Sequence, residues 1–353
     1  MNNKKILLFT TDSVGGAERV TVIIGKYLMN RGYDVLFCIV KGKSISSSIC
    51  SFIPKDARID IIDYCNPVLM TIRLVSRVIK YRPDFVFASC MYLNSKILPF
   101  RFITPNTSYV IRSENYLAMF NARQKLQMSL SYRLADKIIA QNQEMKDEMV
   151  NKLRISPPKI KVLLNPIDTS LINEKLKDEK SPYEDSKRPI FVASGRFAQQ
   201  KGYDIMVRAF AEVLKSIPTA HLYILGDNFG GNEVYQEVML ISNKLNILNH
   251  LHCVGFKNNP YPWIKYADCF VLSSRMEGLP NVLIEALYMG VPSVSTICIP
   301  IISKIVQDGE NGFLANVDDI KSLSDAMIKA LSLKNVKSLY TSASAEDFVN
   351  LFE

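Results

Sequence analysis

A short apolar run, a polar corner and an amphipathic stretch follow one another between Cys269 and Gly290, where the sequence reads CFVLSSRMEGLPNVLIEALYMG. The apolar run 269–272 predicts a short, fully buried strand. Pro280 suits the first turn of a helix, apolar residues then recur at helical spacing, and Gly290 is a typical helix end. A buried strand that leads into a helix is the repeating unit of a parallel sheet with crossover helices.

The same alternation of apolar runs and amphipathic stretches extends along the whole chain in two series. The sequence therefore predicts an α/β protein with two Rossmann-like, doubly wound parallel-sheet domains. Strands are expected at residues 5–11, 34–40, 85–88, 108–112, 137–141 and 160–163 in the first series, and at 190–194, 220–225, 251–254, 269–272, 293–295 and 312–314 in the second.

The length of 353 residues also favours two domains, because one hydrophobic core rarely serves so long a chain. We expect a first domain over residues 1–168, a polar linker over 169–188 and a second domain over 189–335. The tail 336–353 has a helical pattern near 345–352. Its sequence leaves open whether it packs on the second domain or crosses back to the first.

Composition is that of a soluble α/β protein, with 48% hydrophobic and 22% charged residues. The start resembles a signal peptide, but its apolar run is too short, so we interpret it as a first strand. Seven cysteines without CxxC spacing indicate reduced thiols in the cytoplasm. With only three histidines, the sequence predicts no metal site and no cofactor.

Charge is distributed unevenly along the chain. Residues 1–165 contain 25 Lys and Arg against 12 Asp and Glu, a net charge of +13, whereas the rest carries −4. Segments 70–81 and 117–133 pair apolar with basic residues at helical spacing, which favours peripheral contact with the anionic inner face of the cytoplasmic membrane. Core-facing helices with solvated basic backs are the competing interpretation.

The corner after the 269–272 strand is the first candidate binding site. The predicted helix start places backbone N–H groups of Gly278, Leu279, Asn281 and Val282 at the carboxyl edge of a sheet, where a diphosphate can bind. Glu277 and Glu285 are separated by roughly 12 Å of helix, a spacing that suits two hydroxyl-bearing parts of one extended ligand. The alternative makes Glu277 a helix-start charge and Glu285 a solvated residue.

Two further strand-to-helix corners carry candidate residues. Gly195, Arg196 and Lys201 follow the 190–194 strand, and two cations at a helix start suit a departing diphosphate. Surface solvation is the alternative for both cations. Gly15 and Gly16 join the first strand to the first helix and allow a tight turn with close approach of another group. A tight turn without a ligand is the alternative there.

Taken together, these residues resemble glycosyltransferase family 4, over nearly the whole chain. The resemblance rests on the glutamate pair and on five short runs, which are Gly15-Gly16-Ala17-Glu18, Leu164-Asn165-Pro166-Ile167-Asp168, Gly195-Arg196-Phe197 with Gln200-Lys201-Gly202, Leu225-Gly226-Asp227 and Val254-Gly255-Phe256. It implies the GT-B fold, in which two Rossmann-like domains face a cleft, and a retaining reaction that uses a nucleotide-sugar donor, expected to be a UDP-sugar.

The resemblance also implies roles for the candidate residues. Arg196 and Lys201 would bind the donor diphosphate, Glu277 the transferred sugar and Glu285 the ribose, while Phe256 lies where the family holds the base. The first domain has no histidine where many members carry a catalytic one. Glu114 is the best substitute there, with a helix-start charge as its alternative. The run 298–302 also departs from the glycine-rich turn that is usual in the family.

The basic first half and the two amphipathic basic segments favour an acceptor on the cytoplasmic leaflet, so we expect sugar transfer to a lipid-linked saccharide in surface-polysaccharide synthesis. One alternative is a UDP-sugar epimerase or hydrolase of the same fold, although the chain lacks histidines for proton shuttling. Another is a basic nucleic-acid binder. The dispersed basic residues and the absence of a known nucleic-acid-binding motif argue against it, so no nucleic-acid partner is expected.

Overall fold

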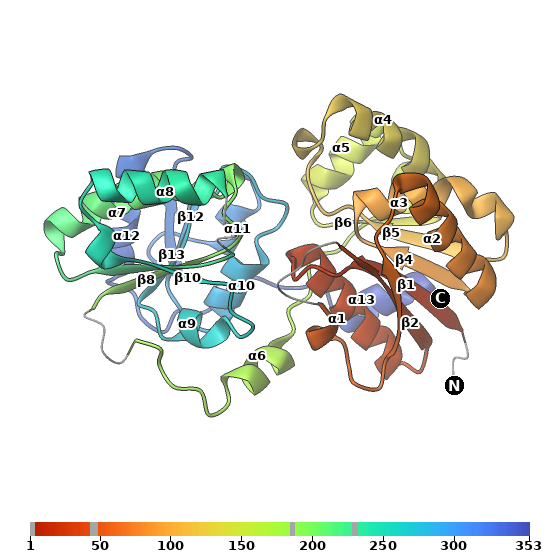
Figure 1. Ribbon diagram of the computed structural model, residues 1–353, viewed down its shortest axis with the longest axis horizontal. Helices are drawn as coiled ribbons and strands as arrows, with labels where there is room; N and C mark the ends of the chain where they lie inside the picture. The colour runs from red at the N-terminus through yellow and green to blue at the C-terminus, as the bar shows by residue number, and fades with distance from the viewer. Residues whose placement is uncertain (1–3, 43–48, 184–187, 228–231) are drawn as a thin grey trace. The chain divides into compact units, whose positions relative to one another are not determined.

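The computed structural model describes residues 4–42, 49–183, 188–227 and 232–353. The chain forms two compact units (Figure 1). The first contains the residues up to Pro166 together with Thr341–Glu353, and the second contains Ile167–Tyr340. Residues 336–340 of the tail thus belong to the second unit, and the rest of the tail belongs to the first.

A parallel sheet with strand order β3-β2-β1-β4-β5-β6-β7 forms the centre of the first unit. Its strands are β1 Lys5–Thr11, β2 Asp34–Lys41, β3 Arg58–Asp63, β4 Phe85–Ala88, β5 Ser108–Arg112, β6 Lys137–Ala140 and β7 Ile160–Val162. The α-helices are α1 Gly16–Asn30, α2 Pro67–Tyr81, α3 Met91–Ile97, α4 Ala122–Ser131, α5 Gln143–Leu153 and, from the tail, α13 Ala345–Val349. Short 3-10 helices include η1 Ile49–Phe52, η2 Leu98–Ile103, η3 Leu117–Met119, η4 Tyr132–Leu134, η5 Pro157–Lys159 and η8 Asn350–Phe352.

Strand β3 is absent from the sequence-based prediction. It pairs in parallel with β2 at the sheet edge, and its residues Ile59 and Ile61 remain exposed. Because charged residues alternate with these isoleucines, the segment lacks the continuous apolar run by which the other strands are predicted. The segment 117–133, which has helical spacing in the sequence, is not one continuous helix. It contains the short helix η3, then α4 and the start of η4.

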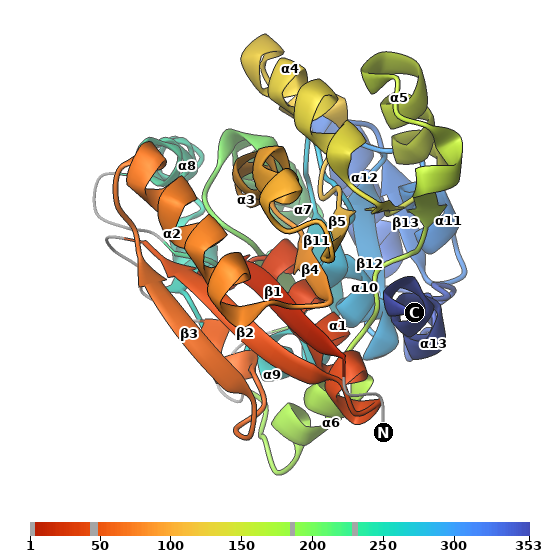
Figure 2. The ribbon, with the colours of Figure 1, turned by 90° about the vertical axis from the view of Figure 1, so that its right-hand side faces the viewer.

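Helices cover both faces of this sheet (Figure 2). Helices α2, α3, α4 and α5 contribute buried residues to a core with one face of the strands, and α1 packs with α13 on the other face. In the tail, the buried Phe352 ring lies 5.6 Å from that of Phe85 and 6.0 Å from that of Phe87. The tail therefore completes the core of the first unit.

The second unit is built on a parallel sheet with strand order β10-β9-β8-β11-β12-β13. Its strands are β8 Ile190–Ser194, β9 His221–Leu225, β10 Leu251–Gly255, β11 Cys269–Leu272, β12 Ser293–Thr296 and β13 Gly312–Ala315. The helices are α6 Thr169–Leu176, α7 Tyr203–Ser216, α8 Glu233–Lys244, α9 Tyr261–Lys265, α10 Asn281–Tyr288, α11 Ile302–Ile305 and α12 Ile320–Ala330, with 3-10 helices η6 Gln199–Lys201 and η7 Leu248–His250. The two sheets with their crossover helices confirm the predicted α/β fold class.

The segment 169–188 was expected as a polar linker, and its described residues belong to the second unit. It begins with helix α6, which is capped by Asp168 and contacts α9. Tyr183 is buried, and its hydroxyl donates a hydrogen bond to the backbone carbonyl of Trp263 at 2.6 Å. The described part of the chain holds no helix with both the length and the hydropathy that a membrane span requires.

Candidate functional site

Two strand-to-helix corners of the second unit are joined to each other. Strands β8 and β11 are neighbours in the parallel sheet, so their carboxyl ends meet at the same edge. The backbone N–H of Arg275 donates to the carbonyl of Gln200 at 2.7 Å, and the Ser273 hydroxyl donates to the carbonyl of Lys201 at 2.8 Å. The Arg275 guanidinium also donates hydrogen bonds to both carboxylate oxygens of Asp204, at 2.9 and 2.7 Å.

Gly202 makes this close approach of the corners possible. Its φ angle of +63° lies in the left-handed region, and a Cβ atom there would lie 2.2 Å from the carbonyl oxygen of Ser273. Both the conformation and the space therefore require glycine at this position. Gly226, which follows β9, is similarly confined, because its Cβ would lie 2.0 Å from the carbonyl oxygen of Gly195.

An ion pair between Lys201 and Glu277 lies where the two corners meet. Lys201 Nζ is 2.7 Å from Glu277 Oε1, and the side chains are only 15% and 9% exposed. The Ser274 hydroxyl donates to the same carboxylate oxygen at 2.6 Å. The sheet edge thus holds one cation and one carboxylate in fixed positions, and surface solvation does not describe Lys201.

Helix α10 follows Glu277 and carries the second glutamate. It begins at Asn281, with Pro280 as its N-cap and with N–H groups of Leu283 and Ile284 donating to the Pro280 carbonyl. Glu285 is buried, at 6% exposure, so its interpretation as a solvated residue is wrong. Gly278, Leu279 and Val282 lie at the same helix start, where backbone N–H groups precede the helical hydrogen-bond ladder.

The other candidate residues of the second unit follow strands β8 and β10 of the same sheet. Arg196 is exposed, and its side chain makes no hydrogen bond or ion pair with the described residues. Gly195 lies beside Lys201, whose Cε atom would be 3.1 Å from a Cβ at Gly195. Phe256 is half-buried directly after Gly255, whose φ angle is +72°. These residues share the carboxyl edge of the sheet with Glu277.

The first unit brings Gly15, Glu18 and Glu114 to the carboxyl edge of its own sheet. The Glu18 carboxylate accepts a hydrogen bond from the Thr11 hydroxyl at 2.6 Å, and a Cβ at Gly15 would lie 2.4 Å from its other oxygen. The φ angle of Gly15 is −90°, so its backbone conformation does not require glycine, and only the Glu18 side chain would have to move for a Cβ there. Gly16 is the first residue of α1.

Glu114 is a carboxyl group with an unusual titration. Burial raises its pKa to about 7, and repulsion from Glu18 adds to the effect. Arg112 and a hydrogen bond from the backbone N–H of Met91, at 3.4 Å, act in the opposite direction. A group with a pKa near neutrality can accept or donate a proton at physiological pH.

Two residues of the second unit's edge were missed by sequence reasoning. Ser274 positions the Glu277 carboxylate, yet a serine three residues before a glutamate is no distinctive signal. Burial raises the pKa of the Cys298 thiol to about 12, and the charge of Glu277 raises it further while Lys201 lowers it, which places this thiol beside the pair. The run 298–302 was noted only as a departure from the family pattern.

The three histidines lie elsewhere in the second unit. Nδ1 of His221 is 2.9 Å from Nε2 of His252, and the His250 ring lies 5.1 Å from that of His221. They group around the amino ends of β9 and β10, away from the carboxyl edge that holds Glu277. Among the described residues, no group of three or more His, Cys, Asp or Glu side chains is arranged to hold a metal ion.

Comparisons of this chain with known proteins identify its family. Residues 14–171 match the family model described as Glycosyltransferase Family 4, and residues 174–346 match that of the glycosyl transferases group 1. An uncharacterized glycosyltransferase of Methanocaldococcus jannaschii is 32% identical over 66% of this chain, and the match spans 62% of that protein.

A second relative comes from Campylobacter jejuni and is 25% identical over 78% of this chain and 76% of its own length. It is named N-acetylgalactosamine-N,N'-diacetylbacillosaminyl-diphospho-undecaprenol 4-alpha-N-acetylgalactosaminyltransferase. Among solved structures, Anabaena HepE in complex with UDP-glucose matches with a TM-score of 0.78 and 17% identity, over 99% of this chain and 98% of that one. That match confirms the GT-B fold. The two family models together cover well over half of the sequence, so the chain belongs to the family 4 type of glycosyltransferases.

Proposed function

We propose that this glycosyltransferase moves a sugar from a UDP-sugar to a lipid-linked saccharide, with retention of the anomeric configuration, during synthesis of a surface polysaccharide such as O-antigen, capsule or exopolysaccharide. The observation that carries the proposal is the Lys201–Glu277 pair at the carboxyl edge of the second sheet. A fixed ammonium group next to a helix start suits a diphosphate, and a fixed carboxylate suits sugar hydroxyls.

The neighbouring residues are assigned the remaining parts of the donor. Lys201 and the exposed Arg196 stabilise the diphosphate as negative charge develops on it. The helix start at residues 278–282 adds backbone N–H groups. Glu277 accepts hydrogen bonds from the transferred sugar, Glu285 on α10 binds the ribose, and Phe256 lies against the base.

Retention follows if the acceptor hydroxyl attacks the face of the sugar from which the diphosphate departs. The bond from the anomeric carbon to the diphosphate oxygen breaks while the bond to the acceptor oxygen forms, and the departing phosphate takes the acceptor's proton. Lys201 and Arg196 then act on the leaving group. Glu114, whose pKa of about 7 allows a proton to be accepted, is assigned to the acceptor hydroxyl or the donor sugar.

Named relatives support the choice of donor and acceptor. The Campylobacter jejuni relative is named for a diphospho-undecaprenol saccharide, and Anabaena HepE has been solved with UDP-glucose. In the first unit, α2 and α4 expose Val68, Ile72, Leu126 and Leu130 beside basic residues. We assign this surface to peripheral contact with the anionic cytoplasmic leaflet.

The donor can be identified by incubating the protein with individual UDP- and GDP-sugars and measuring slow hydrolysis by product mass. We expect release of UDP from one UDP-sugar, and the anomeric NMR signal of the transferred product should match that of the donor. An inverted anomer, or interconversion of two UDP-sugars, would overturn the assignment. Flotation with liposomes at low salt tests the membrane contact. We expect the protein to bind liposomes that contain anionic lipid and not those without it.

The epimerase alternative receives no support from the site. An epimerase needs groups that remove and return a proton at a sugar carbon. All three histidines of the chain lie at the amino ends of β9 and β10, whereas Glu277 and Lys201 lie at the carboxyl edge of the same sheet.

A further inference from the structure

A groove in the first unit is formed by three helices and the short η2 segment. Helices α2, α3 and α4 lie side by side over one face of the sheet (Figure 2), and a cavity of about 590 Å³ opens between them. This volume is in the range of cavities that hold a small ligand. Its walls include Val68 and Ile72 from α2, Tyr92 and Lys96 from α3, and Phe100 from η2.

Lys96 is the cation of this groove. Its Nζ atom lies 3.0 Å from the carbonyl oxygen of Pro67, 3.4 Å from the hydroxyl of Thr71 and 4.9 Å from the centre of the Tyr92 ring. Partial burial lowers its pKa, and no carboxylate of the described residues pairs with it. A half-buried ammonium group with only neutral partners is a favourable site for an anion.

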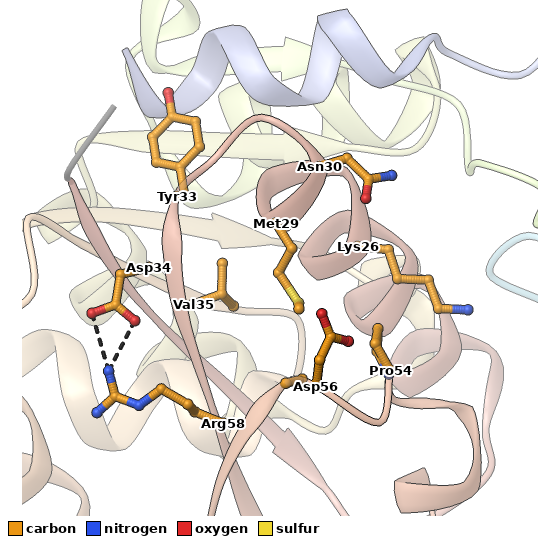
Figure 3. A pocket seen from close by; sticks show the side chains of 10 residues that line it. Lys26, Met29, Asn30, Tyr33, Asp34, Val35, Pro54, Asp56 and Arg58 are labelled. Carbon is orange, nitrogen blue, oxygen red and sulfur yellow. Dashed lines mark hydrogen bonds and ion pairs between the residues drawn. The ribbon is translucent and has the colours of Figure 1, made fainter. Parts of the chain in front are cut away.

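A second pocket of the first unit differs from this groove in how its charges are paired (Figure 3). It lies between the end of α1 and the start of β2, with Lys26, Asp34, Asp56 and Arg58 in its wall. There the guanidinium of Arg58 is neutralised by both carboxylate oxygens of Asp34, at 2.9 and 3.1 Å. The groove at Lys96 has no such internal counter-charge.

Apolar residues line the mouth of the groove at Lys96. Val68 is 71% exposed, Ile72 59% and Phe100 40%, a large exposure for apolar side chains that share one cavity. Exposed apolar residues continue beyond the mouth on η2, at Phe102 and Ile103. An apolar chain leaving the groove would therefore remain on apolar surface.

The groove also borders the edge that carries Glu114. Met91 lines the cavity, and its backbone N–H donates to Glu114 Oε1 at 3.4 Å. A ligand in the groove would thus lie next to the residue assigned above to the reacting groups.

We propose that the groove between α2, α3 and α4 binds the lipid end of the acceptor, a polyprenyl diphosphate, with Lys96 on the diphosphate and Val68, Ile72 and Phe100 along the first isoprenoid units. This inference rests on the proposed function for its acceptor, but its test does not depend on turnover. It is distinct from the general membrane contact, because it requires one particular lipid headgroup rather than an anionic surface.

The test is a calorimetric titration of the full-length protein with farnesyl diphosphate, in saturating UDP so that the donor site is occupied. Farnesol and inorganic diphosphate are titrated separately. Farnesyl diphosphate is expected to bind more tightly than either, because only it satisfies both the cation and the apolar wall. Lys96→Met should weaken its binding about tenfold, as expected for one lost charge-assisted hydrogen bond. Ile72→Ser should weaken it about fivefold through lost apolar contact.

Matched controls lie on α2. Lys80→Met removes an exposed lysine, and Ile79→Ser changes an exposed isoleucine two turns beyond Ile72, and neither residue lines the groove. Both should bind farnesyl diphosphate as the wild type does. Equal binding by Lys96→Met and the wild type, or equal affinity for inorganic diphosphate and farnesyl diphosphate, would overturn the proposal. Absent sugar transfer with intact farnesyl diphosphate binding would instead count against the proposed function alone.

Discussion

Lys201 and Glu277 are 76 residues apart in the sequence, yet their charged atoms lie 2.7 Å apart. The pair is nearly buried, and a second donor, Ser274, holds the carboxylate. Water hydrates such a nearly buried pair only weakly, so each charge is compensated mainly by the opposite charge of its partner. A diphosphate that approaches Lys201 would meet a cation that is already positioned and partly desolvated, which is the arrangement that stabilises a leaving group.

Replacement of Lys201 by methionine is predicted to abolish most of the activity and to weaken the fold. Turnover should fall about 10²- to 10³-fold, the usual effect of losing one stabilising donor. Stability should fall by roughly 3 kcal/mol, because Glu277 would remain buried without its cation. Lys215→Met is the control, since Lys215 pairs with Glu212 on an exposed helix surface and should change little. Wild-type turnover in Lys201→Met would show that the site is misplaced.

Gly202→Ala should disrupt the joined corners far more than the same change at Gly309. Both glycines have φ angles in the left-handed region, +63° and +76°, but only Gly202 would place its Cβ against a neighbouring backbone atom. Gly309→Ala should cost about 1 kcal/mol for the conformation alone. Gly202→Ala should cost about 2 kcal/mol more, because the corner of Ser273 must move. Urea denaturation of the two variants measures the difference, and equal costs would contradict the close packing.

The raised pKa of Glu114 predicts a particular dependence of stability on pH. Ionisation in the native state requires a pH near 7, whereas an unfolded glutamate ionises near its ordinary pKa of 4.5. Below pH 4.5 both states are protonated. As the pH rises from 4.5 towards 7, the unfolded state loses its proton first, so the native state loses stability.

Glu114→Gln removes this titration. Relative to wild type, the variant should gain roughly 1–3 kcal/mol of stability between pH 4.5 and 7.5, as measured from urea unfolding at each pH. A second variant, Glu18→Gln, should lower the pKa of Glu114 by removing the repulsive charge. A constant stability difference between Glu114→Gln and wild type across this range would show that Glu114 titrates normally.

The tail should be necessary for the stability of the first unit. Phe352 is fully buried and contacts the rings of Phe85 and Phe87, so Phe352→Ala should cost about 3–5 kcal/mol. Asn350→Ala alters an exposed residue of the same segment and should have almost no effect. Thermal melting of both variants measures the contribution, and similar melting temperatures would mean that the tail is only loosely attached.

Much of the fold could be predicted because most strands are short, continuous apolar runs. The predicted strands 85–88 and 269–272 are identical to β4 and β11. Strand β3 was missed because an exposed edge position leaves its isoleucines alternating with charged residues. The position of the tail could not be chosen from sequence, since a helix with buried aromatic residues suits the core of either domain.

The candidate site was predictable only to the level of shared sheet edges. Parallel strands place their following loops on the same side, so the corners that carry Lys201 and Glu277 lie at one edge of the sheet. Their direct ion pair, and the hydrogen bond from Ser274, depend on side-chain rotamers and on the Gly202 turn. The histidine group was not expected either, because contact between His221 and His252 depends on the register of β9 and β10.

The dissociation constant of UDP, measured by calorimetry for wild type, Lys201→Met and Lys215→Met, tests most directly whether the Lys201–Glu277 edge holds the donor diphosphate. Lys201→Met should bind UDP at least about tenfold more weakly than wild type, the cost of one charged hydrogen bond, while Lys215→Met binds normally. Equal affinity of all three proteins for UDP would contradict the account.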